Sequence, residues 1–175
     1  MKKPWLFVLL FVMGVLSSGC NDTPSKPVSI DDPRLKESLE KANRYLANDE
    51  EEDIQNYISR HHLEMVATGT GMRYQILKKG DGALIQPGQR VTFEYVLHNI
   101  MGDVVYSSDN DGVKTIDAGC GDVEKGLDEA ILHLHEGDVV KVIIPSHLGY
   151  GLLGDKNLIP ERATLIYTLN ILNVK

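Results

Sequence analysis

The feature that most constrains the fold of this sequence is a series of six strand-like segments interrupted by one helix-like segment. In the strand-like segments apolar residues alternate with polar ones or run on for a few positions, which is typical of β-strands. Turn-rich connectors such as KGDGALIQPGQ and NIMGD lie between them. The predicted strands are MRYQILKKG, QRVTFEYVLHN, DVVYSS, VKTIDAG, VVKVIIP and TLIYTLNIL.

One helix interrupts these strands, in the stretch DVEKGLDEAILHLHEGD. Its apolar residues from Val123 to Leu134 recur at the spacing of one helix face. Asp122 is the expected N-cap, and Gly137 ends the segment. Many strands with one central helix predict an α+β fold, in which a sheet wraps over a single helix.

The last two predicted strands are joined by an unusual connector, HLGYGLLGDKNLIPERATL, which runs from His147 to Leu165. It is roughly three times as long as the median loop of a compact domain. It is also rich in apolar and aromatic side chains and is closed by Pro160. Long loops with apolar content of their own are frequently functional, so we expect this loop to contribute to a binding site.

The N-terminus resembles a bacterial lipoprotein signal peptide. The basic MKK is followed by PWLFVLLFVMGVL, an apolar run too short to span a bilayer stably, and then by small residues and Cys20. We therefore predict a signal peptide over residues 1–19, with lipidation of Cys20 after cleavage. Ser17 departs from the usual pattern, which has a large aliphatic residue three positions before the cysteine. A plain secretory signal and a retained membrane helix are the alternatives.

Residues 20–32 are predicted to be the lipidated cysteine and a flexible tether, because proline, serine and polar residues dominate them. A helical extension is predicted over residues 33–66. Within it, apolar residues recur at helical spacing, and the acidic run NDEEED marks the start of a second helix. We expect two short amphipathic helices between Pro33 and His62. Their apolar stripe is expected to dock on the main domain, and pairing with a second copy to form a homodimer is the alternative.

The composition indicates a soluble globular domain, and the predicted signal peptide indicates that it is exported. The chain has 175 residues, a formal net charge of −7 and 42% hydrophobic residues. This charge argues against nucleic acid as a partner, because that role requires clustered Lys and Arg. There are two cysteines. If Cys20 carries lipid, Cys120 has no partner, and the stability of the domain comes from its core rather than from a disulfide.

Several kinds of catalytic chemistry are missing from the sequence. It has no Gly-x-Ser-x-Gly motif, no dinucleotide fingerprint and no phosphate-binding loop. His133 and His135 lie two residues apart with no third metal ligand in register, which favours a solvated helix end over a metal site. We therefore expect no metal, no cofactor and no covalent chemistry.

The second half of the chain carries a specific set of motifs. EGD, IP, Tyr150-Gly151, Ile159-Pro160 and ATL follow the predicted helix in this order. Upstream, KKGDGALIQPGQRVTFEY contains a GDG turn and a strand of the form G-x-x-V-x-x-x-Y. Over residues 70–175 the sequence resembles the FKBP-type peptidyl-prolyl cis-trans isomerases. The upstream segment resembles the extensions of lipoprotein FKBPs from Bacteroidetes-type bacteria, including those linked to gliding motility.

The resemblance implies a fold and an activity. The fold is an antiparallel half-barrel curled around the Val123–Leu134 helix, preceded here by the short helical extension. The activity is rotation about the peptide bond that precedes proline, in an apolar pocket between helix and sheet. The pocket would remove water from the amide and favour its twisted state, without a nucleophile or a metal.

The resemblance also implies the residues of the pocket. The backbone N–H of Glu124 and the hydroxyl of Tyr150 would each donate to a substrate carbonyl, and Leu127 would form the floor. The residues expected to act in catalysis are Tyr95, Tyr106, Glu124 and Tyr150, and those expected to bind substrate are Val105, Val123, Leu127, Leu158, Ile159 and Tyr167.

Three positions depart from the family pattern. The chain has VYSS at 105–108 where the family often has Phe-Asp-x-Ser, so Tyr106 stands where an aspartate braces the pocket. Lys114 or Val113 occupies the place of a pocket aromatic, and Leu127 that of the floor aromatic common in eukaryotic members. These departures predict a weaker isomerase and poor binding of the macrolide inhibitors of the family.

Two functions are therefore open. The first is a lipid-anchored isomerase that speeds the folding of proline-containing unfolded or nascent exported polypeptides in the cell envelope. The second is an isomerase-fold chaperone or binding module with little turnover. Tyr150, Ile159 and the helix entry favour the first, whereas the missing aspartate favours the second. Asn21 after Cys20 favours the outer membrane over the inner one.

Overall fold

The structure is a computed structural model that describes residues 31–175. The chain divides into two compact units, Met1–Lys41 and Ala42–Lys175. The described part of the first unit is short and becomes helical at Pro33, where α2 (Pro33–Arg60) begins. The predicted signal peptide, the lipidation site at Cys20 and most of the predicted tether lie outside the described residues.

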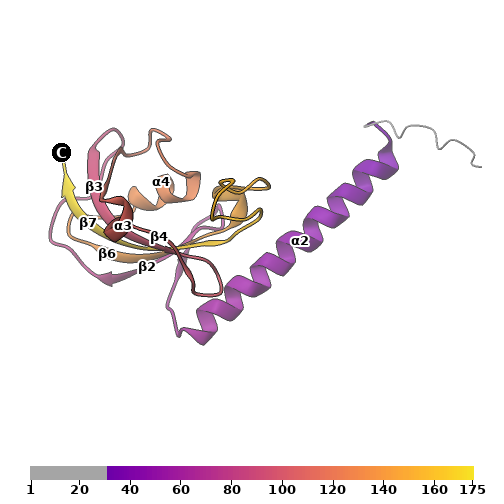
Figure 1. Cartoon of the computed structure of the whole chain (residues 1–175), viewed down its shortest axis with the longest axis horizontal. Coiled ribbons are helices and arrows are strands. Elements are labelled where there is room, and N and C mark those ends of the chain that lie inside the picture. The colour runs from indigo at the N-terminus through magenta and orange to yellow at the C-terminus, as the bar shows by residue number, and fades with distance from the viewer. Residues whose placement is uncertain (1–30) are drawn as a thin grey trace, which may run out of the picture. The chain divides into compact units, whose positions relative to one another are not determined.

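Seven strands of the second unit form one antiparallel sheet in the order β1-β2-β6-β7-β3-β4. The two ends of β3 pair with different partners on its remaining edge, because β5 pairs with Arg90–Phe93 and β4 with Val96–His98. Figure 1 shows the strands curving around the short helix α4 (Lys125–Ile131). The strands are β1 (Val66–Ala67), β2 (Arg73–Lys78), β3 (Arg90–His98), β4 (Val104–Ser107), β5 (Lys114–Asp117), β6 (Val139–Ile144) and β7 (Leu165–Val174).

The sequence pattern of each strand explains which face it buries. In β3, every second residue from Val91 to Leu97 is buried, which is the period of a strand with one face toward the core. In β6 and β7 consecutive residues are buried only at 142–144 and 165–167, where both faces of the sheet are covered, and the remaining residues alternate. The predicted α+β fold, an antiparallel sheet around one short helix, is confirmed.

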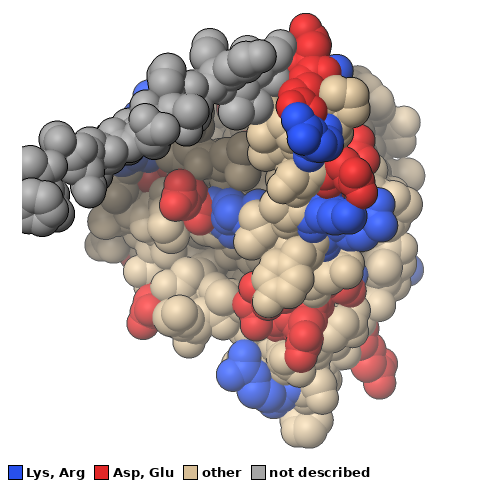
Figure 2. Space-filling model, turned by 90° about the vertical axis from the view of Figure 1, so that its right-hand side faces the viewer, with Lys and Arg blue, Asp and Glu red and all other residues tan. Residues whose placement is uncertain are grey.

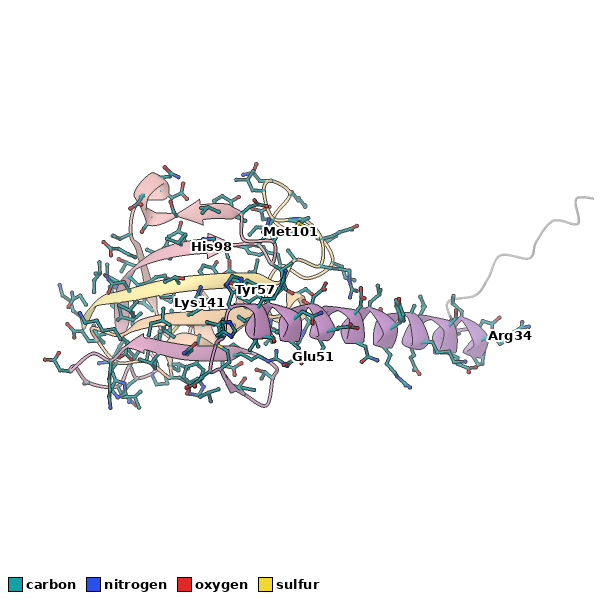
Figure 3. All side chains as sticks on the ribbon, turned by 90° about the horizontal axis from the view of Figure 1, so that it is seen from below. Arg34, Glu51, Tyr57, His98, Met101 and Lys141 are labelled. Carbon is teal, nitrogen blue, oxygen red and sulfur yellow. The ribbon has the colours of Figure 1, made fainter. Side chains whose placement is uncertain are left out.

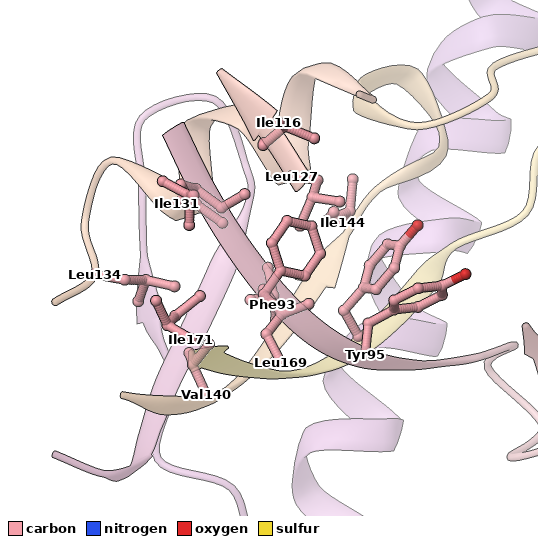
Figure 4. Close-up of a cluster of buried hydrophobic side chains, with 14 of the residues drawn as sticks. Phe93, Tyr95, Ile116, Leu127, Ile131, Leu134, Val140, Ile144, Leu169 and Ile171 are labelled. Carbon is pink, nitrogen blue, oxygen red and sulfur yellow. The ribbon is translucent and has the colours of Figure 1, made fainter. Parts of the chain in front are cut away.

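The main core lies between the concave face of the sheet and α4. Leu127, Ala130 and Ile131 of α4 are fully buried there against residues such as Phe93 and Leu169 (Figure 4). Gly126 lets the helix come this close, because a Cβ at that position would overlap the side chain of Ile144.

The central helix is shorter than the sequence pattern predicts. It begins at Lys125 after the N-cap Glu124, and ends at Ile131 rather than at Leu134. Beyond Ile131 the backbone continues in tight turns, since the N–H of Leu134 donates to the carbonyl of Ile131 over 3.1 Å. Asp122 is not the cap, because its carboxylate accepts from the backbone N–H of Asp117 instead (3.0 Å).

The N-terminal extension forms one helix, not the two that were predicted. The acidic run NDEEED contains neither proline nor glycine, so nothing in it breaks the helix. Two of its carboxylates also find partners outside the helix: Glu50 on Ser146 and Thr164, and Glu51 on Arg73.

The C-terminal part of α2 packs on the outer face of the sheet. Ile54 and Tyr57 are buried against Ile143 of β6 and Ile166 of β7. Figure 3 shows Tyr57 beside the strands that carry His98 and Lys141. The expected docking on the main domain therefore holds for the C-terminal half of the predicted stripe, whereas Leu39 and Leu46 of the other half are 54% and 36% exposed.

Three short elements were not anticipated: β1, the single-turn helix α3 (Ser108–Asp111) and the 3-10 turn η1 (Ser146–Leu148). β1 begins at the end of the range predicted to be a helical extension. Segments of two to four residues are too short to show a periodicity. In contrast, each of the six predicted strands coincides with a strand of the structure, although β7 continues two residues beyond the predicted end.

Acidic and basic side chains lie next to one another on the face drawn in Figure 2. Two of the charge pairs in the fold are Arg73 with Glu51 and Arg90 with Asp117. Among residues 31–175, no helix combines the length and the apolar character needed to cross a bilayer.

Candidate active site

A cavity of about 270 Å³ opens between the concave sheet and the loop after β6. Four tyrosines from four different segments meet there: Tyr95 of β3, Tyr106 of β4, Tyr150 of the loop and Tyr167 of β7. Figure 4 shows Tyr95 at one edge of the core cluster. The remaining lining residues are Leu97, Asp111, Lys114 and Asp155. The four tyrosines predicted for the site are therefore brought together.

The loop after β6 is held in shape by Asp155. One of its carboxylate oxygens accepts from the backbone N–H groups of Asn157 and Ile159, each over 2.8 Å. The N–H of Asp155 in turn donates to the carbonyl of Ile159 over 3.1 Å. These bonds fold the loop back on itself and carry the Ile159 side chain into the core, where it is 2% exposed.

Tyr106, which stands on β4 where an aspartate was expected from the resemblance, binds a carboxylate that comes from the loop. Its hydroxyl donates to the other carboxylate oxygen of Asp155 over 2.5 Å and accepts from the side-chain amide of Asn157 over 3.0 Å. A carboxylate is thus present, but it comes from the loop rather than from β4. A second one comes from α3, where Asp111 accepts from the Tyr95 hydroxyl (3.3 Å).

Glu124 caps α4 beside the cavity. One of its carboxylate oxygens accepts from the hydroxyl of Tyr167 over 3.2 Å. The other oxygen is buried and has no hydrogen-bond partner among the described residues. Glu124 also lines an adjoining cavity of about 350 Å³ together with Val123, Lys114 and Tyr150.

The tyrosines of the site remain protonated hydroxyls at neutral pH. Burial raises the pKa of Tyr150 far above its usual value, and the adjacent Glu124 carboxylate raises it further. The pKa of Tyr167 is raised for the same two reasons, and that of Tyr95 by burial and by Asp111. Each phenol therefore keeps its single proton as a hydrogen-bond donor, and those of Tyr95, Tyr106 and Tyr167 are directed at the carboxylates of Asp111, Asp155 and Glu124.

The predicted apolar residues take three kinds of position: buried, partly exposed and exposed. Leu127 and Ile159 are buried in the core beneath the site, and Val105 and Val123 pack against that core from partly exposed positions. Leu158 is 56% exposed. The catalytic and substrate-binding roles of all ten residues stay predictions.

Asp111 was not predicted from the sequence, because it lies on the unanticipated turn α3. Its partner Tyr95 is sixteen positions away along the chain. The only available signal was the acidic run SDND directly after a predicted strand. The contact of Asp155 with Tyr106 could not be anticipated either, because forty-nine positions separate the two residues.

Comparison with known proteins now decides the family. Residues 82–172 match the family model of the FKBP-type peptidyl-prolyl cis-trans isomerases. This chain belongs to that family. The matched FKBP domain contains all ten predicted site residues.

Relatives of the FKBP domain come from bacteria and eukaryotes. The chain is 36% identical to an FK506-binding protein of Neisseria meningitidis serogroup B over 105 residues, which is 59% of this chain and 96% of the relative. It is 42% identical to the peptidyl-prolyl cis-trans isomerase FKBP2 of Mus musculus over 57 residues, 33% of this chain and 41% of that protein. The crystal structure of AtFKBP13 is similar with a TM-score of 0.62 and 27% identity, covering 65% of this chain and all of that one.

The chain is thus an FKBP-type peptidyl-prolyl cis-trans isomerase, whose domain binds proline-containing peptides. The cavity lined by the four tyrosines is the candidate site for such a peptide. A larger cavity of about 360 Å³ lies between α2 and the loops around Met101 and Glu161, and it contains none of the predicted site residues.

The Asp155 carboxylate makes the loop sensitive to acid. Partial burial acts to raise its pKa, but hydrogen bonds from Tyr106, Asn157 and Ile159 outweigh this and lower the pKa below 3.8. A lowered pKa in the folded state stabilises the loop above the pKa of the unfolded chain, and this stabilisation is lost as the pH falls through the folded value. Activity that depends on the ordered loop should therefore persist at pH 4 and fall only below it.

Asp155→Asn tests this, because asparagine keeps the shape of the side chain but not its charge. We expect kcat/KM at pH 7 to fall about fivefold, since charge-assisted hydrogen bonds are roughly twice as strong as neutral ones. The ratio of wild-type to variant activity should shrink toward one below about pH 4, while circular dichroism reports that both proteins are folded. Equal activities at pH 7 would contradict the assigned role of the carboxylate.

Proposed function

We propose that this protein is a lipid-anchored folding catalyst that isomerises X-Pro bonds of exported proteins at the cell envelope. The single observation that carries the proposal is the cavity of four protonated tyrosines above the dry core around Leu127 and Ile159. The N-terminal sequence, with its basic start, short apolar run and Cys20, supports the anchor. The same sequence supports placement among the Bacteroidetes-type lipoprotein forms of the family.

The chemistry needs only a change of environment. Rotation about a peptide bond has a barrier of about 18–20 kcal/mol, because resonance makes the amide planar and places charge on its oxygen. Without a catalyst, isomerisation of an X-Pro bond takes about 10–100 s. A site that excludes water disfavours the planar, more polar amide relative to the twisted one. Lowering the barrier by about 8 kcal/mol would accelerate the reaction roughly a millionfold.

The residues of the cavity divide this task. Leu127 and Ile159 give the cavity an apolar base from within the core, and of the residues that line the cavity itself Leu97 and the tyrosine rings are its apolar part. The hydroxyl of Tyr150 holds a substrate carbonyl in place, and because the phenol keeps its proton it does so as a donor. Fixing one carbonyl while the other side of the bond rotates is selective binding of the twisted state.

Removal of the Tyr150 hydroxyl should lower activity without harming the fold. In a protease-coupled assay on Ala-Leu-Pro-type peptides, we expect Tyr150→Phe to reduce kcat/KM about tenfold, the effect of one lost hydrogen bond of about 1.4 kcal/mol. The matched control is Tyr45→Phe, since Tyr45 is 70% exposed on α2 and should give wild-type rates. Equal rates for wild type and Tyr150→Phe would remove Tyr150 from the mechanism.

The turnover of the wild-type protein in this assay, together with an aggregation assay, separates the two functions. A wild-type protein that lacks turnover but suppresses aggregation would be a binding module, and the proposed catalytic function would be wrong.

Cell fractionation tests the lipid anchor. In fractionated cells the isomerase should sediment with membranes, the outer membrane more than the inner. The variant Cys20→Ser should release it to the soluble fraction.

A further inference from the structure

The loop that bears Tyr150 is held at both of its ends by one carboxylate. Ser146 immediately precedes the loop and Thr164 closes it. One oxygen of Glu50 accepts from the backbone N–H of Ser146 (2.6 Å) and from the hydroxyl of Thr164 (2.7 Å). The other oxygen accepts from the hydroxyl of Ser146 (2.8 Å). Glu50 therefore ties together two points that are eighteen residues apart along the chain.

The partners of Glu50 leave it little freedom. Ser146 and Thr164 are each 6% exposed, so the groups that Glu50 binds are largely buried while the carboxylate is in place. Hydrogen bonds to an ionised carboxylate are about twice as strong as neutral ones. The three bonds of Glu50 thus form a strong crosslink, which we term the brace, at the base of the loop.

The helix that supplies Glu50 is itself fixed on the FKBP domain. Ile54 and Tyr57, one and two turns further along α2, are buried against the outer face of the sheet. The neighbouring Glu51 binds the guanidinium of Arg73 with both of its oxygens, each over 2.7 Å. The turns of α2 that follow Glu50 are therefore held on the domain, and all of these contacts lie within the unit Ala42–Lys175.

The loop between the braced ends forms one side of the active-site cavity. Its Tyr150 and Asp155 line the cavity, and its Ile159 enters the core below. Tyr150 lies only four residues beyond Ser146. The N–H of the next residue, Gly151, donates to the carbonyl of Ser146 over 2.9 Å. A shift of Ser146 therefore moves the backbone that carries the Tyr150 side chain.

We propose that Glu50 is a positioning residue of the isomerase, acting from outside the FKBP domain through Ser146 and Thr164 on Tyr150. This inference rests on the proposed function of the Tyr150 cavity. It gives the N-terminal extension a part in the reaction: α2 is a component that sets the geometry of the active-site loop, rather than only a link to an anchor. Glu50 lies outside residues 82–172, so an FKBP domain without α2 lacks the brace.

Three variants separate positioning from simple support of the fold. Glu50→Ala removes the brace, and we expect kcat/KM to fall about tenfold because the loop groups lose their alignment. Glu50→Gln keeps the shape, and its amide can accept from the Ser146 N–H and donate to the Ser146 hydroxyl, so activity should return to within about twofold of wild type. Glu52→Ala is the matched control, since Glu52 is an exposed carboxylate of the same turn of α2 that takes no part in the brace or in the Glu51–Arg73 pair, and its activity should be unchanged.

A second measurement does not depend on catalysis. Amide hydrogen exchange of the loop, for example at Gly151 and Ile159, should become about tenfold faster in Glu50→Ala but not in Glu52→Ala. Equal loss of activity in the two alanine variants, or unchanged exchange in Glu50→Ala, would overturn the inference. If the wild type has no turnover, the proposed function fails, while the exchange result still decides whether the brace orders the loop.

Discussion

Replacing Gly154 by alanine is expected to lower kcat/KM for proline peptides at least about tenfold, the effect of misplacing an active-site group. Gly154 has φ of +62°, and a Cβ there would overlap the carbonyl oxygen of Ile159 and lie 2.8 Å from the carbonyl carbon of Pro160. The obstacles are backbone atoms, which cannot swing aside as a side chain can. The loop must therefore open near Asp155 and Ile159, which are the residues that hold it over the cavity.

Gly151→Ala is the matched control for this substitution. Gly151 lies in the same loop with φ of +60°, but nothing approaches its Cβ position within 4 Å. Alanine there meets only the strain of the left-handed conformation, about 1–2 kcal/mol. We expect Gly151→Ala to reduce stability slightly and to keep activity within about twofold. Equal activity losses in the two variants would show that backbone strain, and not the overlap with Ile159, governs the loop.

Asp138→Ala should have the largest effect on stability, lowering the free energy of unfolding by about 3 kcal/mol. Asp138 is 1% exposed at the turn before β6. Its carboxylate accepts from the backbone N–H groups of Gly80 and His135, each over 2.7 Å. Alanine leaves both donors in the interior without a partner, and it separates the two turns that the carboxylate joins. Urea denaturation followed by circular dichroism measures the loss.

Asp122→Ala is the comparison for Asp138→Ala. The Asp122 carboxylate also accepts from a backbone N–H, that of Asp117 over 3.0 Å, but it lies on the surface, where water can replace it. A loss below about 1 kcal/mol is expected. If Asp138→Ala cost no more than Asp122→Ala, the buried carboxylate would not be what holds the Gly80 and His135 turns together.

Much of this fold follows from local sequence patterns. The alternation in RVTFEYVLHN predicted β3 because a strand with one buried face must repeat every two residues. Periodicity also located α4, but not its ends, because Asp122 could cap a helix or bind a turn and the local sequence does not distinguish these uses. The same limit explains α2: the acidic run was expected to start a new helix, whereas two of its carboxylates bind residues of the distant FKBP domain.

For the active site, the residue types and the loop that carries them were predictable, since motifs such as Tyr150-Gly151 and Ile159-Pro160 are contiguous in sequence. The hydrogen bonds that join these residues in the folded site were not predictable. The pairs Tyr106 with Asp155 and Tyr95 with Asp111 each link separate elements, and the Glu50 brace links the extension to both ends of the loop. A side chain's partner depends on how strands and helices pack, and a sequence pattern is local. Composition and periodicity therefore determined the class of fold, while long-range packing decided which carboxylates serve the site.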